Sequence, residues 1–263
     1  MHWEKKLFNK WVSVFRKIEG PELEPTLWHS HYLTARFSEK CLTILGRKLQ
    51  GKVLDVGAGT GHGARYLNKD KTVYYPTDLP TARDSSDETV SMKPEKIKVC
   101  CSCYELPFSN GSMEGMMFIS VLEHLENPPL ALKEAHRVMG SGGDILISTP
   151  FIFPVHSFPM DFRRWTLEGL KLEMKNAGFE CLEGETMGNT FASLALNINL
   201  FLKYHMNCGK SEIFHLMTAL AMPMILIMQF ILNIVAIALG PLDGSNAFPL
   251  GVAVLGKKRE KIN

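Results

Sequence analysis

The sequence predicts an α/β fold, in which helices flank a mostly parallel sheet and an apolar helical insertion precedes the last strand. Three observations lead to this prediction. An apolar run breaks into alternating glycines at 52–63, strand-like and helix-like segments alternate after it, and a long apolar segment at 213–239 precedes a final strand-like run. Alternating strands and helices are typical of parallel sheets. At 263 residues, the chain is long enough for one such domain with additions.

The first element is a buried strand that ends in a glycine-rich turn. The segment KVLDVGAGTGHG at 52–63 holds one acid, Asp55, followed by glycines at alternate positions: Gly57, Gly59, Gly61 and Gly63. Glycine permits positive φ angles and leaves no Cβ between the backbone and a ligand. A helix expected over 60–68 directs its N-terminal N–H groups towards the turn. The pattern predicts a nucleoside or nucleotide site.

Two classes of cofactor fit this turn. The first is a dinucleotide, with the fingerprint G-x-G-x-x-G. If this fingerprint starts at Gly57, its last position requires a small residue, but His62 occupies it. If it starts at Gly59, it lies late relative to the end of the strand. The alternative pattern, D-x-G-x-G-x-G, starts at Asp55. A second strand, TVYYPT, ends at Asp78, and an acid in this place can accept both ribose hydroxyls of an adenosine in either class.

The rest of the chain distinguishes the two classes by resemblance. The D-x-G-x-G-x-G turn is similar to motif I of the class I S-adenosylmethionine-dependent methyltransferases. The segment ELPF at 105–108, an apolar strand at 112–120 and the VLEH that follows resemble the LPF and VLEH segments of the same family. A helix at 130–139 and a strand at 144–149 continue the match. The resemblance, which covers 51–179, implies a Rossmann-like sheet of seven strands and S-adenosyl-L-methionine as the cofactor.

The resemblance also implies which residues contact this cofactor. In the family, the acid and glycines of motif I wrap the methionine end and the ribose. An acid that commonly bonds the adenine amino group is replaced here by Ser102. Backbone amides at Cys103 and Tyr104, or the carboxylate of Glu105, are the alternative contacts. The expected cofactor-binding residues are Asp55, Gly57, Gly59, Gly61, Asp78, Ser102, Cys103 and Ser120.

Three side chains, His124, His156 and Asp161, are expected to act on the acceptor. Methyl transfer from a sulfonium releases a neutral leaving group, so the protein mainly orients the acceptor and, for a hydroxyl, removes a proton. His124 follows the fourth strand, at the edge where α/β sheets bind ligands. His156 and Asp161 lie in a long proline-rich loop that resembles the P-x-x-x-x-H-x-x-P-x-D-[FY]-x-R-[FW]-T segment of bacterial methyltransferases linked with cell-surface saccharides and lipids.

Each of these side chains also has a structural interpretation. His124 can serve only to orient the turn, and Asp161 can pair with an arginine to hold the loop. Arg163 or Arg164 can alternatively bind a phosphate or carboxylate on the acceptor.

The N-terminal region, 1–50, is expected to form a helical lid over the cofactor, with a helix near 34–49. His29 and His31 precede this helix, but the sequence reveals no third ligand for them, and we expect no metal site.

The CCSC cluster at 100–103 contains one C-x-x-C without a second pair, which is more typical of small buried residues than of structural zinc.

The apolar segment 213–239 carries no Asp, Glu, Lys or Arg and exceeds the roughly 20 residues that cross a bilayer as a helix. The resemblance implies that strands at 179–187 and 250–256 form an antiparallel hairpin in one sheet, so the insertion at 189–248 must leave and return on the same side. We therefore expect a helical hairpin, bent near Pro223, that contacts the membrane peripherally without crossing it. Burial as a helical cap or in a dimer interface is the alternative.

Composition limits the partners and the compartment. The net charge of +2, with both signs interspersed, gives no electrostatic basis for nucleic-acid binding. Unpaired cysteines suit a reducing cytoplasm, and membrane contact would then be with the inner face of the membrane.

The sequence thus predicts an S-adenosylmethionine-dependent methyltransferase with its core at 51–188 and 249–263. The expected acceptor is a small-molecule, lipid-linked or saccharide compound. Two alternatives are an NAD(P)-linked oxidoreductase on a Rossmann sheet and a non-catalytic, methyltransferase-like binding protein.

Overall fold

The computed structural model describes residues 2–20, 25–79, 99–205 and 212–259, which form two compact units. The first, here called the core unit, comprises Glu39–Phe151, Val155–Met187 and Gly251–Asn263. The second, the helical unit, comprises Met1–Ser38, Ile152–Pro154 and Gly188–Leu250. This division differs from the three segments expected from the sequence, because residues 1–38 group with the insertion and residues 39–50 group with the sheet.

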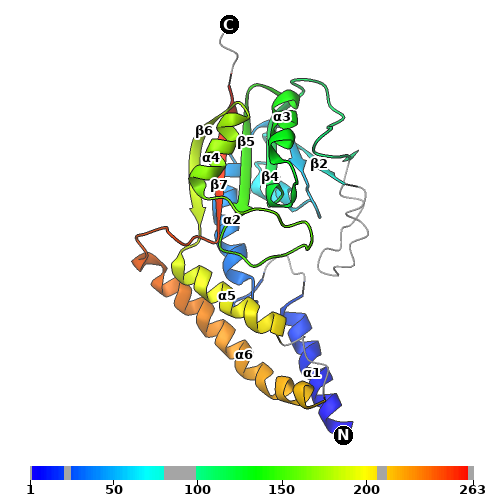
Figure 1. Cartoon of the computed structure of the whole chain (residues 1–263), viewed down its shortest axis with the longest axis vertical. Helices are drawn as coiled ribbons and strands as arrows, with labels where there is room; N and C mark the ends of the chain where they lie inside the picture. The colour runs from blue at the N-terminus through cyan, green and yellow to red at the C-terminus, as the bar shows by residue number, and fades with distance from the viewer. Residues whose placement is uncertain (1, 21–24, 80–98, 206–211, 260–263) are drawn as a thin grey trace. The chain divides into compact units, whose positions relative to one another are not determined.

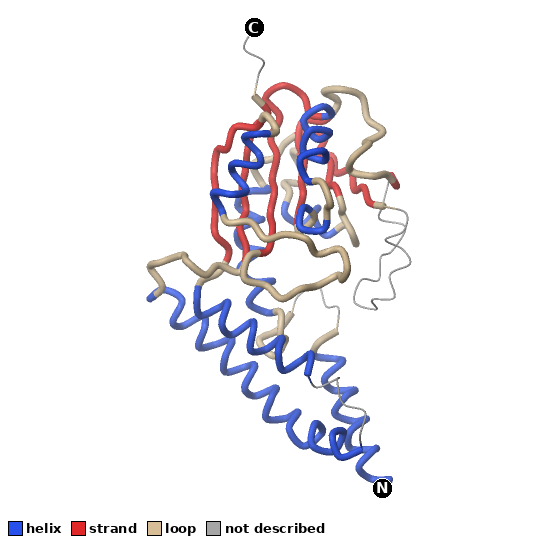
Figure 2. The backbone as a smooth tube through the Cα atoms, viewed as in Figure 1, coloured by secondary structure: helices blue, strands red, loops and turns tan. Residues whose placement is uncertain are grey.

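The core unit is built on one seven-stranded sheet with the order β3-β2-β1-β4-β5-β7-β6, drawn in red in Figure 2. Figure 1 labels β2, β4, β5, β6 and β7. Its strands are β1 Gly51–Val56, β2 Thr72–Asp78, β3 Val99–Cys100, β4 Met113–Ile119, β5 Met139–Pro150, β6 Phe179–Met187 and β7 Gly251–Lys258. Strands β1 to β5 pair in parallel, whereas β7 is antiparallel to both β5 and β6. The mostly parallel, seven-stranded sheet expected from the sequence is confirmed.

Helices cover both faces of this sheet. On β4, Met116 and Phe118 join the apolar cluster that contains residues of α3 (Pro128–Val138) and α4 (Leu167–Asn176). Met117 belongs instead to the cluster with Leu42 and Leu45 of α2 (Tyr32–Gly46). Successive residues of a strand face opposite sides, so the nearly continuous apolar run of β4 is buried on both faces.

Two local elements differ from the sequence expectation. The helix expected over 60–68 is only a 3-10 turn, η1 (His62–Tyr66), because Gly61 is left-handed with a φ of 74° and further glycines disfavour a longer helix. Strand β5 begins at Met139, before the glycines that were expected to separate a helix from a strand at 144. The extra residues form a bulge opposite β4, where Gly142 takes a φ of 70°.

The helical unit is built around α1 (His2–Ile18), α5 (Thr190–His205) and α6 (Glu212–Leu239), with a short turn, η5 (Gly240–Leu242), after α6. Helices α5 and α6 lie side by side, as Figure 1 shows, and α1 packs on α6 through Phe15, Met222 and Leu226. The expected bend near Pro223 is wrong, because α6 continues through Pro223 as one helix. The packing of α1 on the adjoining turns supports α6 where proline removes a backbone hydrogen bond, and the hairpin is formed by α5 and α6 together.

The helical unit buries polar side chains and exposes apolar ones. Gln229 and Asn233 of α6 and Asn199 of α5 are 0% exposed. Asn199 Nδ2 donates to Asn233 Oδ1 at 3.1 Å, and Asn233 Nδ2 donates to the carbonyl oxygen of Leu27 at 2.8 Å. The exposed apolar residues of α5 and α6 include Leu194, Ile198, Phe201, Met217, Leu220, Met224, Ile227, Met228, Ile231, Ile234 and Val235. This arrangement reverses that of a water-exposed amphipathic helix, whose polar side chains face solvent.

Candidate active site

The glycine-rich turn follows β1 and lies against the ends of the two neighbouring strands. Gly57, Gly59 and Gly61 all have left-handed backbones, with φ values of 70°, 53° and 74°. The Gly59 N–H donates to Asp78 Oδ2 at 2.7 Å, which ties the turn to the end of β2. A Cβ added at Gly57 would lie 2.7 Å from Cγ2 of Val121, in the turn after β4. At Gly59, by contrast, no described atom lies within 4 Å of an added Cβ, so the backbone there is open to a ligand.

Asp55 lies beneath this turn, on its core side. The residue is 2% exposed, and the Tyr74 hydroxyl donates to Asp55 Oδ2 at 2.5 Å. A Cβ added at Gly63 would lie 2.1 Å from the same oxygen. Burial raises the pKa of Asp55 to about 7, the charge of Asp78 acts in the same direction, and the hydrogen bond from Tyr74 opposes them. Asp55 therefore supports the turn from below, and its expected contact with the cofactor stays a prediction.

The raised pKa of Asp55 predicts that Asp55→Asn stabilises the core unit at neutral and higher pH. An acid whose pKa rises on folding, here from 3.8 to about 7, binds a proton more tightly in the folded state, so stability falls as the pH rises through this window. Asparagine is uncharged and can still accept the hydrogen bond from Tyr74. The melting temperature of Asp55→Asn should exceed that of the wild type at about pH 8, and the difference should shrink towards about pH 4. Thermal unfolding across this range measures the effect, and a lower melting temperature at the alkaline end would contradict it.

The residues expected to contact the adenosine lie at the same edge of the sheet as Asp78. After β3, the Cys101 N–H donates to the carbonyl oxygen of Asp78 at 2.9 Å. Ser102 Oγ accepts a hydrogen bond from the Tyr104 N–H at 3.2 Å, which closes a local turn. Cys103 packs against the core cluster, and burial raises the pKa of its thiol to about 11. Ser102 and Cys103 thus adjoin the end of β2, where a nucleoside site was expected.

The chain turns sharply after β4. Ser120 has a φ of 52°, and its N–H donates to the carbonyl oxygen of Ser148 on β5 at 2.9 Å. The 3-10 turn η4 (Leu122–His124) follows and places Glu123 inside the core unit and His124 at its surface, with 0% and 24% of the two side chains exposed. The turn therefore presents a histidine at the carboxyl end of β4, as expected from the sequence.

The loop after β5 is organised by Asp161. Both carboxylate oxygens accept hydrogen bonds from Arg164, and Oδ2 also accepts from the His156 N–H at 2.9 Å. These bonds, that from Arg164 foremost, hold the pKa of Asp161 well below its usual range, so the carboxylate stays ionised. Nδ1 of His156 lies 3.2 Å from Asp161 Oδ2. Arg163 donates to the backbone carbonyl oxygens of 125–126, so both arginines hold the loop through such contacts.

The two expected catalytic histidines lie together. The rings of His124 and His156 meet edge to face, with centroids 4.8 Å apart. Nδ1 of His124 lies 2.5 Å from the Met160 carbonyl oxygen, and its Nε2 lies 3.8 Å from Glu123 Oε1. Burial raises the pKa of Glu123 to about 8. Glu123 was not among the expected site residues, although its place before His124 in VLEH was the available signal.

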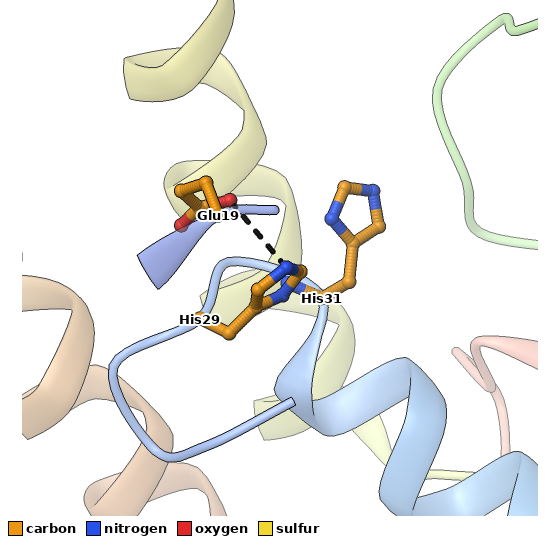
Figure 3. A group of neighbouring side chains, drawn as sticks. All are labelled: Glu19, His29 and His31. Atoms are coloured by element: carbon orange, nitrogen blue, oxygen red, sulfur yellow. Dashed lines mark hydrogen bonds and ion pairs between the residues drawn. The ribbon is translucent and has the colours of Figure 1, made fainter. Parts of the chain in front are cut away.

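A second group of titratable residues, Glu19, His29 and His31, lies in the helical unit and is drawn in Figure 3. Glu19, beyond the end of α1, is the third partner that the sequence did not reveal for the two histidines. Its carboxylate lies 2.9 Å from Lys203 Nζ, 4.0 Å from His29 Nε2, and accepts from the Ser30 N–H at 2.8 Å. Burial lowers the pKa of His31 to about 4. Because Lys203 already neutralises Glu19, this group is best explained as a structural ion pair that joins α5 to the chain after α1.

Residues 54–147 match the family model described as a methyltransferase domain. Among curated proteins, the sarcosine/dimethylglycine N-methyltransferase of Aphanothece halophytica is 33% identical over 104 residues, which are 38% of this chain and 38% of that protein. The chain therefore covers well under two thirds of the length of this relative.

Solved structures show the same fold. The [4+2]-cyclase SpnF aligns with a TM-score of 0.54 at 17% identity, over 86% of this chain and 81% of that chain. Phosphoethanolamine N-methyltransferase 2 of Haemonchus contortus aligns with a TM-score of 0.50 at 16% identity, over 84% of this chain and 53% of that chain. At these identities the likeness concerns the fold alone.

Proposed function

We propose that this chain, which carries a class I S-adenosylmethionine-dependent methyltransferase domain, transfers a methyl group from S-adenosyl-L-methionine to a small-molecule acceptor. The observation that carries the proposal is the arrangement at one edge of the sheet. A turn with three left-handed glycines is bonded to Asp78, and His124 and His156 lie together after β4 and β5. Ligands of open α/β sheets bind at this carboxyl edge.

The residues at this edge fit the cofactor. The open backbone at Gly59 leaves room for a ligand. The carboxylate of Asp78 accepts hydrogen bonds from the N–H groups of Gly59 and Leu79 and can also accept from ribose hydroxyls. The other residues proposed to hold the cofactor are Gly57, Gly61, Ser102, Cys103 and Ser120, with Asp55 below them. When bound, S-adenosylmethionine supplies an electrophilic methyl group on a sulfonium.

His124 and His156 are the side chains proposed to orient the acceptor and to take its proton. Their side chains are 24% and 25% exposed, so both reach the surface. Histidine can accept a proton near neutral pH. Because Nδ1 of His124 faces the Met160 carbonyl oxygen, its Nε2 is the nitrogen that can act as a base. The ionised carboxylate of Asp161 positions His156 beside it.

Calorimetric titration with S-adenosylmethionine, S-adenosylhomocysteine and NAD(H) tests the proposed cofactor. We expect binding of the two sulfur nucleosides only, and Asp78→Asn should weaken it by about 10- to 100-fold, because charge-assisted hydrogen bonds to the ribose contribute about 1.5–3 kcal/mol. Asp144→Asn, which changes a partly exposed acid within β5 that lies 3.6 Å from Lys257 Nζ, is the matched control and should bind normally. Binding of NAD(H) alone would favour the oxidoreductase, and binding of none of the three would favour the non-catalytic alternative.

We also propose that the helical unit attaches the protein to a membrane, where a lipid-linked acceptor is available. Within the described residues, one helix, Leu216–Leu242, is long and apolar enough to cross a bilayer, and only 28% of its most apolar part is buried in the protein. Gln229 and Asn233 of this helix are buried, and Asn233 accepts a hydrogen bond from Asn199 of α5, which is the pattern of helices immersed in lipid. Exposed lysines on α1, at positions 6, 10 and 17, suit anionic headgroups.

Chain connectivity favours a hairpin that enters the membrane without crossing it. Strand β6 leads into α5, and α6 leads into β7, so both ends of the hairpin connect to strands of one sheet. With 16 residues, α5 is about 24 Å long, shorter than the roughly 30 Å apolar layer of a bilayer. A hairpin at the inner, cytoplasmic face is therefore the proposed mode of attachment.

A further inference from the structure

Two histidines and one acid of the core unit are arranged as metal ligands. The ligand atoms of Glu123, His124 and His156 all lie within 4.8 Å of one another. They come from η4 and from the loop after β5, and the Phe162 N–H joins these two segments by donating to the Glu123 carbonyl oxygen at 2.9 Å. The three side chains therefore form one local group inside a single unit.

Each histidine ring of this group is oriented by an acceptor at its Nδ1. For His124 the acceptor is the Met160 carbonyl oxygen at 2.5 Å, and for His156 it is Asp161 Oδ2 at 3.2 Å. Metal-bound histidines usually donate one ring N–H to a backbone carbonyl or a carboxylate, which fixes the other nitrogen as the ligand. Both contacts are of this kind and make Nε2 of each ring the ligating atom, so metal binding and proton uptake at Nε2 of His124 exclude each other.

Glu123 provides an independent indication of a cation. The residue is 0% exposed, and neither carboxylate oxygen hydrogen-bonds to a described residue. A buried carboxylate without hydrogen bonds is costly, and such groups in proteins are normally paired or bound to metal. Arg164, whose charge also acts on Glu123, donates to both oxygens of Asp161 and hydrogen-bonds to neither oxygen of Glu123.

We propose that Glu123, His124 and His156 bind a divalent first-row transition-metal ion, such as Zn²⁺ or Fe²⁺. One carboxylate and two imidazoles form the mixed oxygen and nitrogen set that these ions prefer. Ligands at about 2.0–2.2 Å from zinc lie about 3.3 Å apart, so Nε2 of His124, at 3.8 Å from Glu123 Oε1, needs only a small movement. Three protein ligands leave coordination positions open for water or an acceptor oxygen.

Titration of the EDTA-treated full chain with Co²⁺, followed by visible absorbance and by competition with Zn²⁺, tests this proposal. We expect one Co²⁺ per chain. Glu123→Gln and His156→Ala should each weaken binding by about 100-fold. Asp161→Asn, which removes the charge that orients His156 and that pairs with Arg164, should weaken it by about 10-fold. The readout is metal binding alone, so it does not depend on the proposed methyl transfer.

His205→Ala is the matched control for the metal site. His205 is exposed on α5, and its Nδ1 also faces a backbone carbonyl oxygen, that of Phe201 at 2.8 Å, but no acid joins it in the groups identified among the described residues. Glu123→Gln keeps the shape of the side chain and breaks no hydrogen bond of its carboxyl group, so it should fold with an unchanged or higher melting temperature. The proposal is overturned if the wild type binds no stoichiometric Co²⁺, if both site variants bind it normally, or if His205→Ala abolishes binding.

Discussion

Gly63→Ala should lose S-adenosylmethionine binding and be destabilised by about 3 kcal/mol or more, at the upper end of overpacking effects. The added Cβ would lie 2.1 Å from Asp55 Oδ2 and 2.9 Å from the Met117 Cε atom. Asp55 cannot move away easily, because it is buried and bonded to Tyr74. The glycine turn must therefore shift off β1. Thermal unfolding measures the loss of stability, and calorimetry measures the loss of cofactor affinity.

Gly59→Ala is the control that separates collision from backbone strain. No described atom lies within 4 Å of its added Cβ, so only the φ of 53° opposes the substitution, at a cost of about 1–2 kcal/mol. The double variant Asp55→Ala/Gly63→Ala removes the oxygen that the methyl group meets and should recover part of the stability lost in Gly63→Ala. If Gly63→Ala melts like the wild type, Asp55 does not lie tightly beneath the turn.

The triple variant Leu220→Glu/Met224→Glu/Ile227→Glu should move the protein from membranes into the soluble fraction. These side chains are 60%, 73% and 52% exposed on α6. Immersing a fully exposed side chain of this kind in lipid is worth about 1.5–3 kcal/mol, so for three partly exposed ones the partition coefficient should fall by at least about 10²-fold. Sedimentation with anionic phospholipid vesicles measures the change. Glutamate is a good helix former, so α6 should persist.

The matched control places the same charges on exposed apolar residues of the core unit. Ile44, Leu172 and Leu182 are 54%, 58% and 46% exposed, and their replacement by glutamate should leave vesicle binding unchanged. Equal loss of binding in both triple variants would contradict attachment through α6. A wild-type protein that does not bind vesicles, or a shift in oligomeric state with the α6 variant alone, would favour the covered-interface alternative.

Local signals were strong enough to predict the sheet. These signals are the glycine turn after 53–56, the apolar run of β4, and the two acids at strand ends, Asp55 and Asp78. All of them indicate backbone conformations and burial that depend on nearby residues. The same signals failed where a distant contact decides the outcome. Nothing near Pro223 shows that α1 packs across that turn, so a bend was expected where α6 is continuous.

The candidate site was likewise predictable from the sequence only in part. The sequence indicated that His124 and His156 lie at ligand-binding loops, but their edge-to-face contact depends on how η4 and the loop after β5 fold back on each other. The burial of the Glu123 carboxyl group without hydrogen bonds and the ion pair of Glu19 with Lys203 likewise exist only once distant segments meet. Burial and partners set the pKa of a side chain and its use as a ligand, and neither is a local property of the chain.

By itself, the sequence determined the fold class, the mostly parallel character of the sheet and the place of the glycine-rich turn, because glycine, apolar periodicity and strand-ending acids act through local conformation and burial. Only the tertiary structure decided that residues 1–38 join the insertion, that the helical unit places polar groups inside, and that Glu123 faces two histidines. These features arise from contacts between segments far apart in the chain, and such contacts are fixed when the whole molecule packs.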